Sequence, residues 1–229
     1  MKKINWRKLG FEFVSIFIAV VLAFALTNWN ENRKDKNTAK NILTEILNGL
    51  EKDVEDININ KYGHKVGIRA CEYWRQVINN EEFNQDSVYN QYFRLTRDFF
   101  SAQNISGYET LKSKGLELIK NDSLRFNIIS LYEYNYRSLK VLEETYYEAQ
   151  FQANYFSNIN DIMAPYFIFD EKGTMVKIRT PIQMEASQKN ILLSYLWKIQ
   201  VNRNFILSYY DEVEKKINEL KAQIDRELD

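Results

Sequence analysis

The chain has 229 residues, which is enough for one domain of ordinary size next to a short N-terminal segment. Its 31 basic and 31 acidic residues balance, so no excess of charge favours binding to nucleic acid. The single cysteine excludes an intramolecular disulfide and a thiolate metal cluster, and the single histidine excludes most metal sites and most histidine-based catalysis.

An apolar segment at residues 11–29 is the strongest feature of the chain, and it carries no charge from Phe13 to Leu26. A helix over these residues is about 28 Å long, which is close to the hydrocarbon thickness of a bilayer. Trp6 and Trp29 lie on either side of it, at the spacing of aromatic anchors in the two headgroup layers. We therefore predict a single transmembrane helix at 11–29, preceded by a short tail at 1–10.

Two other readings of this segment stay open. A cleaved signal peptide is one, because Ala23, Phe24 and Ala25 resemble a small-x-small cleavage site behind a basic stretch. A buried core helix is the other, although an all-round apolar segment of this length is uncommon in soluble domains.

The basic residues at the two ends of the segment bear on its orientation. Four precede it and four follow it: Lys2, Lys3, Arg7 and Lys8, then Arg33, Lys34, Lys36 and Lys40. The free amino terminus adds charge to the first group, and acidic residues are mixed into the second. The positive-inside rule then favours a cytoplasmic N-terminus, with the large domain on the other side of the membrane.

Small side chains recur every fourth residue within the predicted span, at Ser15, Ala19, Ala23 and Thr27, and Glu12 lies just beyond this stripe. Such stripes let two helix backbones approach closely in lipid, where packing drives helix association. We expect the stripe to pack against a second copy of the chain or against the helix of a membrane protein partner. Glu12 at the interface is expected to reach headgroup water.

Residues 30–229 are predicted to form a bundle of long helices. Apolar residues recur with helical period from Ile42 to Ile57, in a stripe that either pairs with another chain as a short coiled coil or packs on later helices. Shorter helices are expected after Asp86 and between Ser106 and Gly115, followed by a long one from Asp122 that ends before Pro165.

The C-terminal part contributes a small hairpin and a last long helix. Two short β-branched or aromatic runs around the turn-like residues 170–173 predict a hairpin near 166–179. From Ser187 to Leu228 apolar residues again keep helical period, and antiparallel packing of this helix on the membrane-proximal one would close the bundle. The predicted fold class is all-α: a transmembrane helix that continues into an antiparallel bundle, with a small hairpin.

No residue pattern predicts chemistry. His64 and Cys71 are separated by about 10 Å of helix rise, too far for a nucleophile and its base. No Glu-x-x-His pair for a di-metal bundle occurs, and no glycine-rich phosphate loop is present. The many tyrosines between residues 132 and 155 are expected to fill the core and the bundle edges, rather than to form a ligand cage. We expect neither an enzyme nor a cofactor or metal.

Two blocks of the sequence resemble a known family. Glu12, Ala19 and Ala23, with the run Asn28-Trp29-Asn30-Glu31-Asn32-Arg33-Lys34, are similar to the N-terminal signature of a family of bacterial single-span membrane proteins with a domain of unknown function. Phe11 and Ala19 stand where that family has glycines. The block from Tyr108 to Ser113 with Gly115, Leu118-Ile119 and Leu124-Arg125 is similar to its second recurrent block. The resemblance implies an anchored all-helical protein in a bacterial inner membrane, and it implies no activity.

Together these features predict a membrane-anchored, non-enzymatic scaffold or sensory module that associates with itself. A membrane-associated effector or signalling subunit that acts with a partner protein is the alternative. The lipid bilayer is the expected partner in both cases, and the domain is expected to be periplasmic.

Overall fold

A computed structural model describes residues 6–229, with side chains from Gly10 onward. The main helices are α1 (Trp6–Asn79), α2 (Val88–Leu95), α3 (Ser106–Lys114), α4 (Asp122–Ser130), α5 (Arg137–Thr145), α6 (Phe151–Met163) and α7 (Ala186–Leu228). A two-stranded antiparallel sheet, β1 (Phe167–Phe169) and β2 (Met175–Ile178), completes them. The predicted all-α fold with a small hairpin is confirmed.

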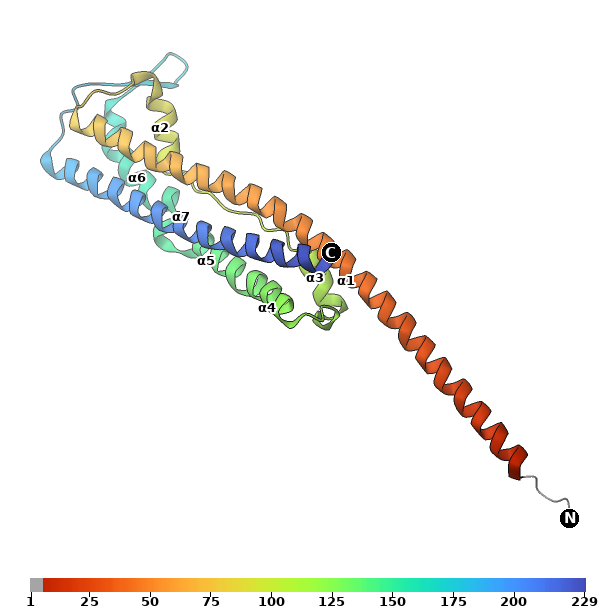
Figure 1. Ribbon diagram of the computed structural model, residues 1–229. Coiled ribbons are helices and arrows are strands. Elements are labelled where there is room, and N and C mark those ends of the chain that lie inside the picture. The colour runs from red at the N-terminus through yellow and green to blue at the C-terminus, as the bar shows by residue number, and fades with distance from the viewer. Residues whose placement is uncertain (1–5) are drawn as a thin grey trace.

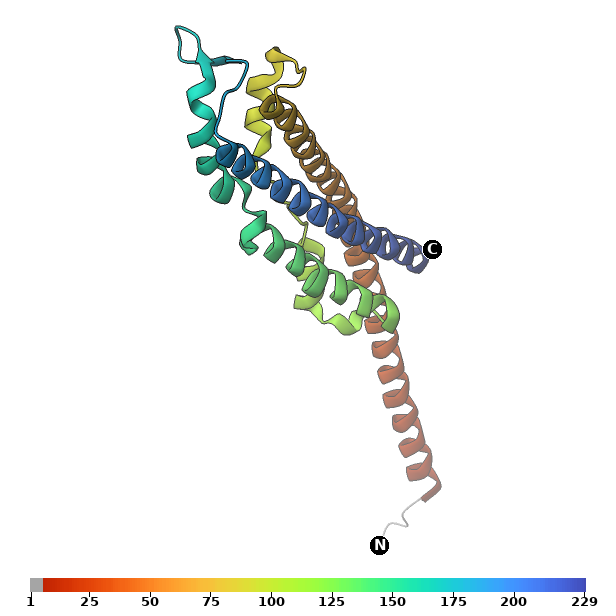
Figure 2. The same cartoon turned by 90° about the vertical axis from the view of Figure 1, so that its left-hand side faces the viewer.

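The two long helices form the frame of the domain. α7 runs antiparallel to α1, and the C-terminus lies near the point where α1 leaves the bundle (Figure 1). The shorter helices α4, α5 and α6 pack along α7, while α2 and α3 pack on α1 (Figures 1 and 2). The apolar stripe that begins at Ile42 is buried in this frame, so it packs within its own domain.

The N-terminal part of α1 extends far beyond the bundle (Figures 1 and 2). All side chains from Gly10 to Asn37 are exposed, and the large apolar ones between Phe11 and Trp29 expose between 47% and 76% of their surface. Among the described helices, α1 is the one that is long and apolar enough to cross a membrane. The reading of this segment as a buried core helix is therefore wrong.

One prediction about helix continuity differs from the structure, although α1 itself is unbroken from Trp6 to Asn79. The long helix expected after Asp122 is divided instead: a π-helix, η3 (Leu131–Tyr136), joins α4 to α5, and a break with a short 3-10 turn, η4 (Tyr147–Ala149), separates α5 from α6. An apolar repeat that continues across a break cannot reveal it, because both flanking helices bury the same face.

Other elements begin and end close to their predicted positions. α3 ends at Lys114, before Gly115 with its left-handed φ of 107°, which glycine adopts without steric cost. The hairpin pairs Phe167 with Ile178 and contains an irregularity between Ile168 and Phe169. Its buried residues rest on the helices, as an isolated two-stranded hairpin requires.

Candidate functional site

The small-residue stripe predicted in the apolar segment lies on the exposed part of α1. Ser15 Oγ donates to the backbone oxygen of Phe11 at 2.8 Å, and Thr27 Oγ1 donates to that of Ala23 at 2.9 Å. These bonds satisfy both hydroxyl donors inside the helix, which suits a helix in lipid, where no water replaces them. Ala19 lies between them, and the whole stripe is accessible to another helix.

Of the residues predicted to flank the stripe, the structure describes the side chains of Glu12 and Trp29. Glu12 is exposed one turn before the stripe. The Trp29 ring is exposed, and the guanidinium of Arg33 lies 5.9 Å from its centroid. The Trp6 side chain lies outside the described residues.

A connecting segment, residues 96–105, runs between α2 and α3 along α1 without helix or strand (Figure 1). Its amides need partners from elsewhere, because buried N–H groups left unpaired are costly. Asp53 accepts from the Asn104 amide at 2.7 Å, Asp56 from the Ala102 amide at 2.9 Å, and Glu143 from the Ser101 amide at 3.1 Å. Carboxylates from α1 and α5 thus hold this segment in place.

Two of these carboxylates are buried and also bind tyrosine hydroxyls. Tyr136 donates to Asp53, and Tyr210 donates to Glu143. Burial raises the pKa of Asp53 and of Glu143, while the hydrogen bonds that they accept act in the opposite direction. Each acid has defined donors, so both serve the packing of the connecting segment.

Within residues 10–229, Arg203 of α7 is the most deeply buried charged residue, with an exposed fraction of 0%. Its guanidinium donates to the backbone oxygens of Leu95 at 3.1 Å and of Arg97 at 2.9 Å. It also lies 3.1 Å from His64 Nδ1 and 4.1 Å from the centroid of the Phe151 ring. Because a guanidinium has donors only, His64 Nδ1 must accept this hydrogen bond, and the imidazole is neutral.

Burial shifts the pKa values of His64 and Cys71 in opposite directions. Burial, with a smaller contribution from the charge of Arg203, lowers the pKa of His64 to about 3. Burial raises the pKa of the Cys71 thiol to about 12. Both side chains are enclosed, so a reactive thiolate does not form at neutral pH.

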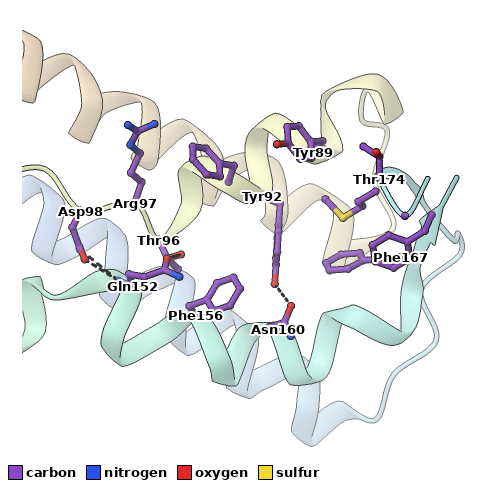
Figure 3. Close-up of a pocket in the computed structure, with 14 residues that line it drawn as sticks. Tyr89, Tyr92, Thr96, Arg97, Asp98, Gln152, Phe156, Asn160, Phe167 and Thr174 are labelled. Carbon is purple, nitrogen blue, oxygen red and sulfur yellow. Dashed lines mark hydrogen bonds between the residues drawn. The ribbon is translucent and has the colours of Figure 1, made fainter. Parts of the chain in front are cut away.

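A pocket of about 690 Å³ lies at the end of the domain opposite the apolar segment, between α2, α6 and the hairpin (Figure 3). This volume is within the range of small-molecule sites. Six of the residues that line it are aromatic: Tyr89, Tyr92, Phe93, Phe156, Phe167 and Phe169. The Tyr92 and Phe167 rings pack edge to face with centroids 4.8 Å apart, and Trp74 supports both from behind.

Most polar groups of the pocket already have partners. Tyr92 donates to Asn160 Oδ1 at 2.8 Å, and Thr96 donates to Gln152 Oε1 at 2.7 Å. Asp98 caps the start of α6, where it accepts from the Phe151 amide at 2.7 Å. The pocket was not predicted from the sequence, because its wall combines residues 89–98 with residues 152–175, and these two stretches are far apart in the chain.

The charged group of Arg97 differs from these hydrogen-bonded groups. Its guanidinium lies over the Phe93 ring at 5.2 Å and over the Phe99 ring at 5.9 Å. No described residue places a carboxylate within salt-bridge distance of it. The pocket therefore has an apolar wall and one free positive charge at its end (Figure 3).

No group of three metal-ligating side chains occurs among the residues that the structure describes. Comparisons with protein-family models, with curated proteins and with solved structures found no match.

Proposed function

We propose that the chain is a single-span protein of a bacterial inner membrane that carries a non-enzymatic helical binding module and associates with itself. Residues 11–29 form the span, the N-terminus is cytoplasmic and the domain is periplasmic. The observation that carries this proposal is the exposed apolar surface from Phe11 to Trp29. Contiguous exposed apolar surface of this extent is rare on soluble monomers, and a bilayer would cover it on all sides.

The interior of the domain supports a binding role over a catalytic one. His64 and Cys71 are buried and unreactive, and the buried acids Asp53 and Glu143 hold the connecting segment. The aromatic pocket is the place where a ligand would bind, since large apolar pockets with few convergent polar groups are the usual form of such sites.

Retention in the membrane is the first test. The intact chain should stay in the membrane pellet after alkaline carbonate extraction, and its mass should equal that of the unprocessed sequence. Release into the supernatant would refute the anchor, and loss of the first 25 residues would show that the segment is a cleaved signal peptide. A reporter fused after Asp229, close to where α1 leaves the bundle, then reports on which side the domain lies.

Self-association has a separate test. We expect Ala19→Cys and Ala23→Cys to form disulfide-linked dimers in membranes under mild oxidation, because the small-residue stripe would face the partner helix. Val21→Cys lies on the opposite face of the helix and should remain monomeric. The native Cys71 is buried and gives no background. Monomers for all three variants would contradict self-association.

A second candidate is a signalling subunit that acts with a membrane partner. The observation that favours it is the unbroken helix α1, which connects the span to Trp74 behind the pocket. Replacing residues 13–26 with an unrelated apolar helix should then abolish capture of the partner while the anchor is kept. Capture that survives the replacement would contradict this role.

A further inference from the structure

We propose that the aromatic pocket binds a water-soluble amphiphile, with an aromatic body against the ring wall and a carboxylate paired with Arg97. This inference rests on the proposed function, because it uses the pocket as the site of the binding module and the span to locate the membrane. It adds the chemical class of the ligand.

The shape and lining of the pocket select the body of the ligand. Its volume of about 690 Å³ holds a molecule of drug-like size. Rings from α2, α6 and the hairpin line it, and Tyr89, Phe93 and Phe169 each expose more than half of their surface. Flat aromatic groups pack well on such walls in offset or edge-to-face geometry.

The charge at the end of the pocket selects an anion. Arg97 is the basic residue in its lining and Asp98 is the acidic one. Asp98 accepts the Phe151 amide at the start of α6, and its side chain turns away from Arg97 (Figure 3). Among the described residues, the Arg97 guanidinium contacts two aromatic rings and no carboxylate, so its donors remain available for a carboxylate, which arginine binds in a bidentate manner. A cationic ligand would be repelled by the same group.

The distance of the pocket from the span indicates where the ligand comes from. Trp74 contacts two residues of the pocket wall and lies 45 positions after Trp29 on one continuous helix. This separation corresponds to about 70 Å of helix rise. The headgroup layers are much thinner than that, so lipids of the surrounding bilayer do not reach the pocket. The ligand therefore arrives from water.

The test uses the full chain in lipid nanodiscs and two probes of nearly equal shape, 1-naphthaleneacetate and its neutral amide. Their binding is measured by isothermal titration calorimetry, with empty nanodiscs subtracted. We expect Arg97→Gln to weaken binding of the acid about tenfold, as expected from loss of a charge-assisted hydrogen bond, and to leave the amide unchanged. Arg94→Gln, an exposed arginine one turn earlier that does not line the pocket, should change neither.

A third variant tests whether the probes bind in the pocket. Thr174→Trp places a large side chain into its hairpin end and should abolish binding of both probes, with an unchanged circular dichroism spectrum as proof of folding. Equal affinity of the acid for the wild type and Arg97→Gln would overturn the role of the charge. Absence of binding by the wild type, or binding that survives Thr174→Trp, would overturn the ligand class and the site. The anchor and self-association have their own readouts, so these failures are distinguishable from failure of the proposed function.

Discussion

The contact between His64 and Arg203 makes the stability of the domain depend on pH in a direction that the structure defines. His64 has an exposed fraction of 1% and accepts a hydrogen bond from a buried guanidinium. Protonation would remove the acceptor and place two positive charges side by side. Burial and this charge lower the pKa of His64 in the folded state to about 3, from an ordinary value of 6.5.

The sign and size of the effect follow from linkage. The stabilising contribution of the neutral imidazole is complete above pH 6.5, and it is lost as the pH falls from 6.5 towards 3. Because one pKa unit corresponds to about 1.4 kcal/mol, lowering the pH from 7 to 5 should cost about 2 kcal/mol of the free energy of unfolding through His64 alone.

The variant His64→Asn isolates this contribution. Its amide oxygen offers Arg203 an acceptor that does not titrate, although loss of the ring between Phe99, Phe151 and Tyr210 lowers stability at every pH. Urea unfolding of the full chain in detergent at pH 7, 6 and 5, followed by tryptophan fluorescence, gives the two curves. We expect the wild type to lose about 2 kcal/mol more than the variant over this range.

The buried acids act with the opposite sign and cancel in this comparison. Burial raises the pKa of Asp53, Asp98 and Glu143, so the stability that they contribute is complete at low pH and is lost as the pH rises through their raised pKa values. Wild type and variant share these groups. Parallel curves for the two proteins would show that His64 is not a buried neutral base, and would refute the reasoning.

Two further substitutions probe the same interior by urea unfolding, with the exposed Glu55→Ala as a control expected to change stability by less than about 0.5 kcal/mol. Gly67→Ala would place its Cβ 2.4 Å from Nε of Arg203. Because three hydrogen-bond partners fix the Arg203 side chain, we expect the free energy of unfolding to fall by about 1–3 kcal/mol. Unchanged stability would mean that Arg203 can move. Asp53→Leu leaves the Asn104 amide and a tyrosine hydroxyl buried without an acceptor, at about 1–3 kcal/mol each. Hydrogen exchange at Asn104 should accelerate, and unchanged protection would contradict the assigned role of Asp53.

Periodicity alone was enough to predict the frame of the domain. The apolar stripes of α1 and α7 are buried where they were expected, from Ile42 onward and from Leu192 to Ile224, and the hairpin lies within the predicted range. Local composition determines these features, because a helix with one apolar face has few ways to bury it.

The burial of charged side chains inside the bundle was not predicted, although the sequence contains a signal for it. In α1, Asp53 occupies a position of the apolar repeat between Leu50 and Ile57. In α7, Arg203 occupies a position of the apolar repeat between Ile199 and Ile206. A charge at a core position of a helix must find partners, because it is too costly to bury alone. Those partners lie in the connecting segment, whose extended course depends on contacts with distant helices and cannot be derived from local pattern.

The aromatic pocket depends on this interior. The Arg203 guanidinium donates to the backbone oxygens of Leu95 and Arg97. Through these bonds α7 fixes the backbone that carries the Arg97 side chain of the pocket. The same arginine relies on neutral His64 in α1, the helix that begins with the exposed apolar segment. A ligand that pairs with Arg97 would therefore act on a segment that is bonded directly to both long helices. This connection gives a binding event at the end of the domain a physical route to α1, without requiring any change in the shorter helices.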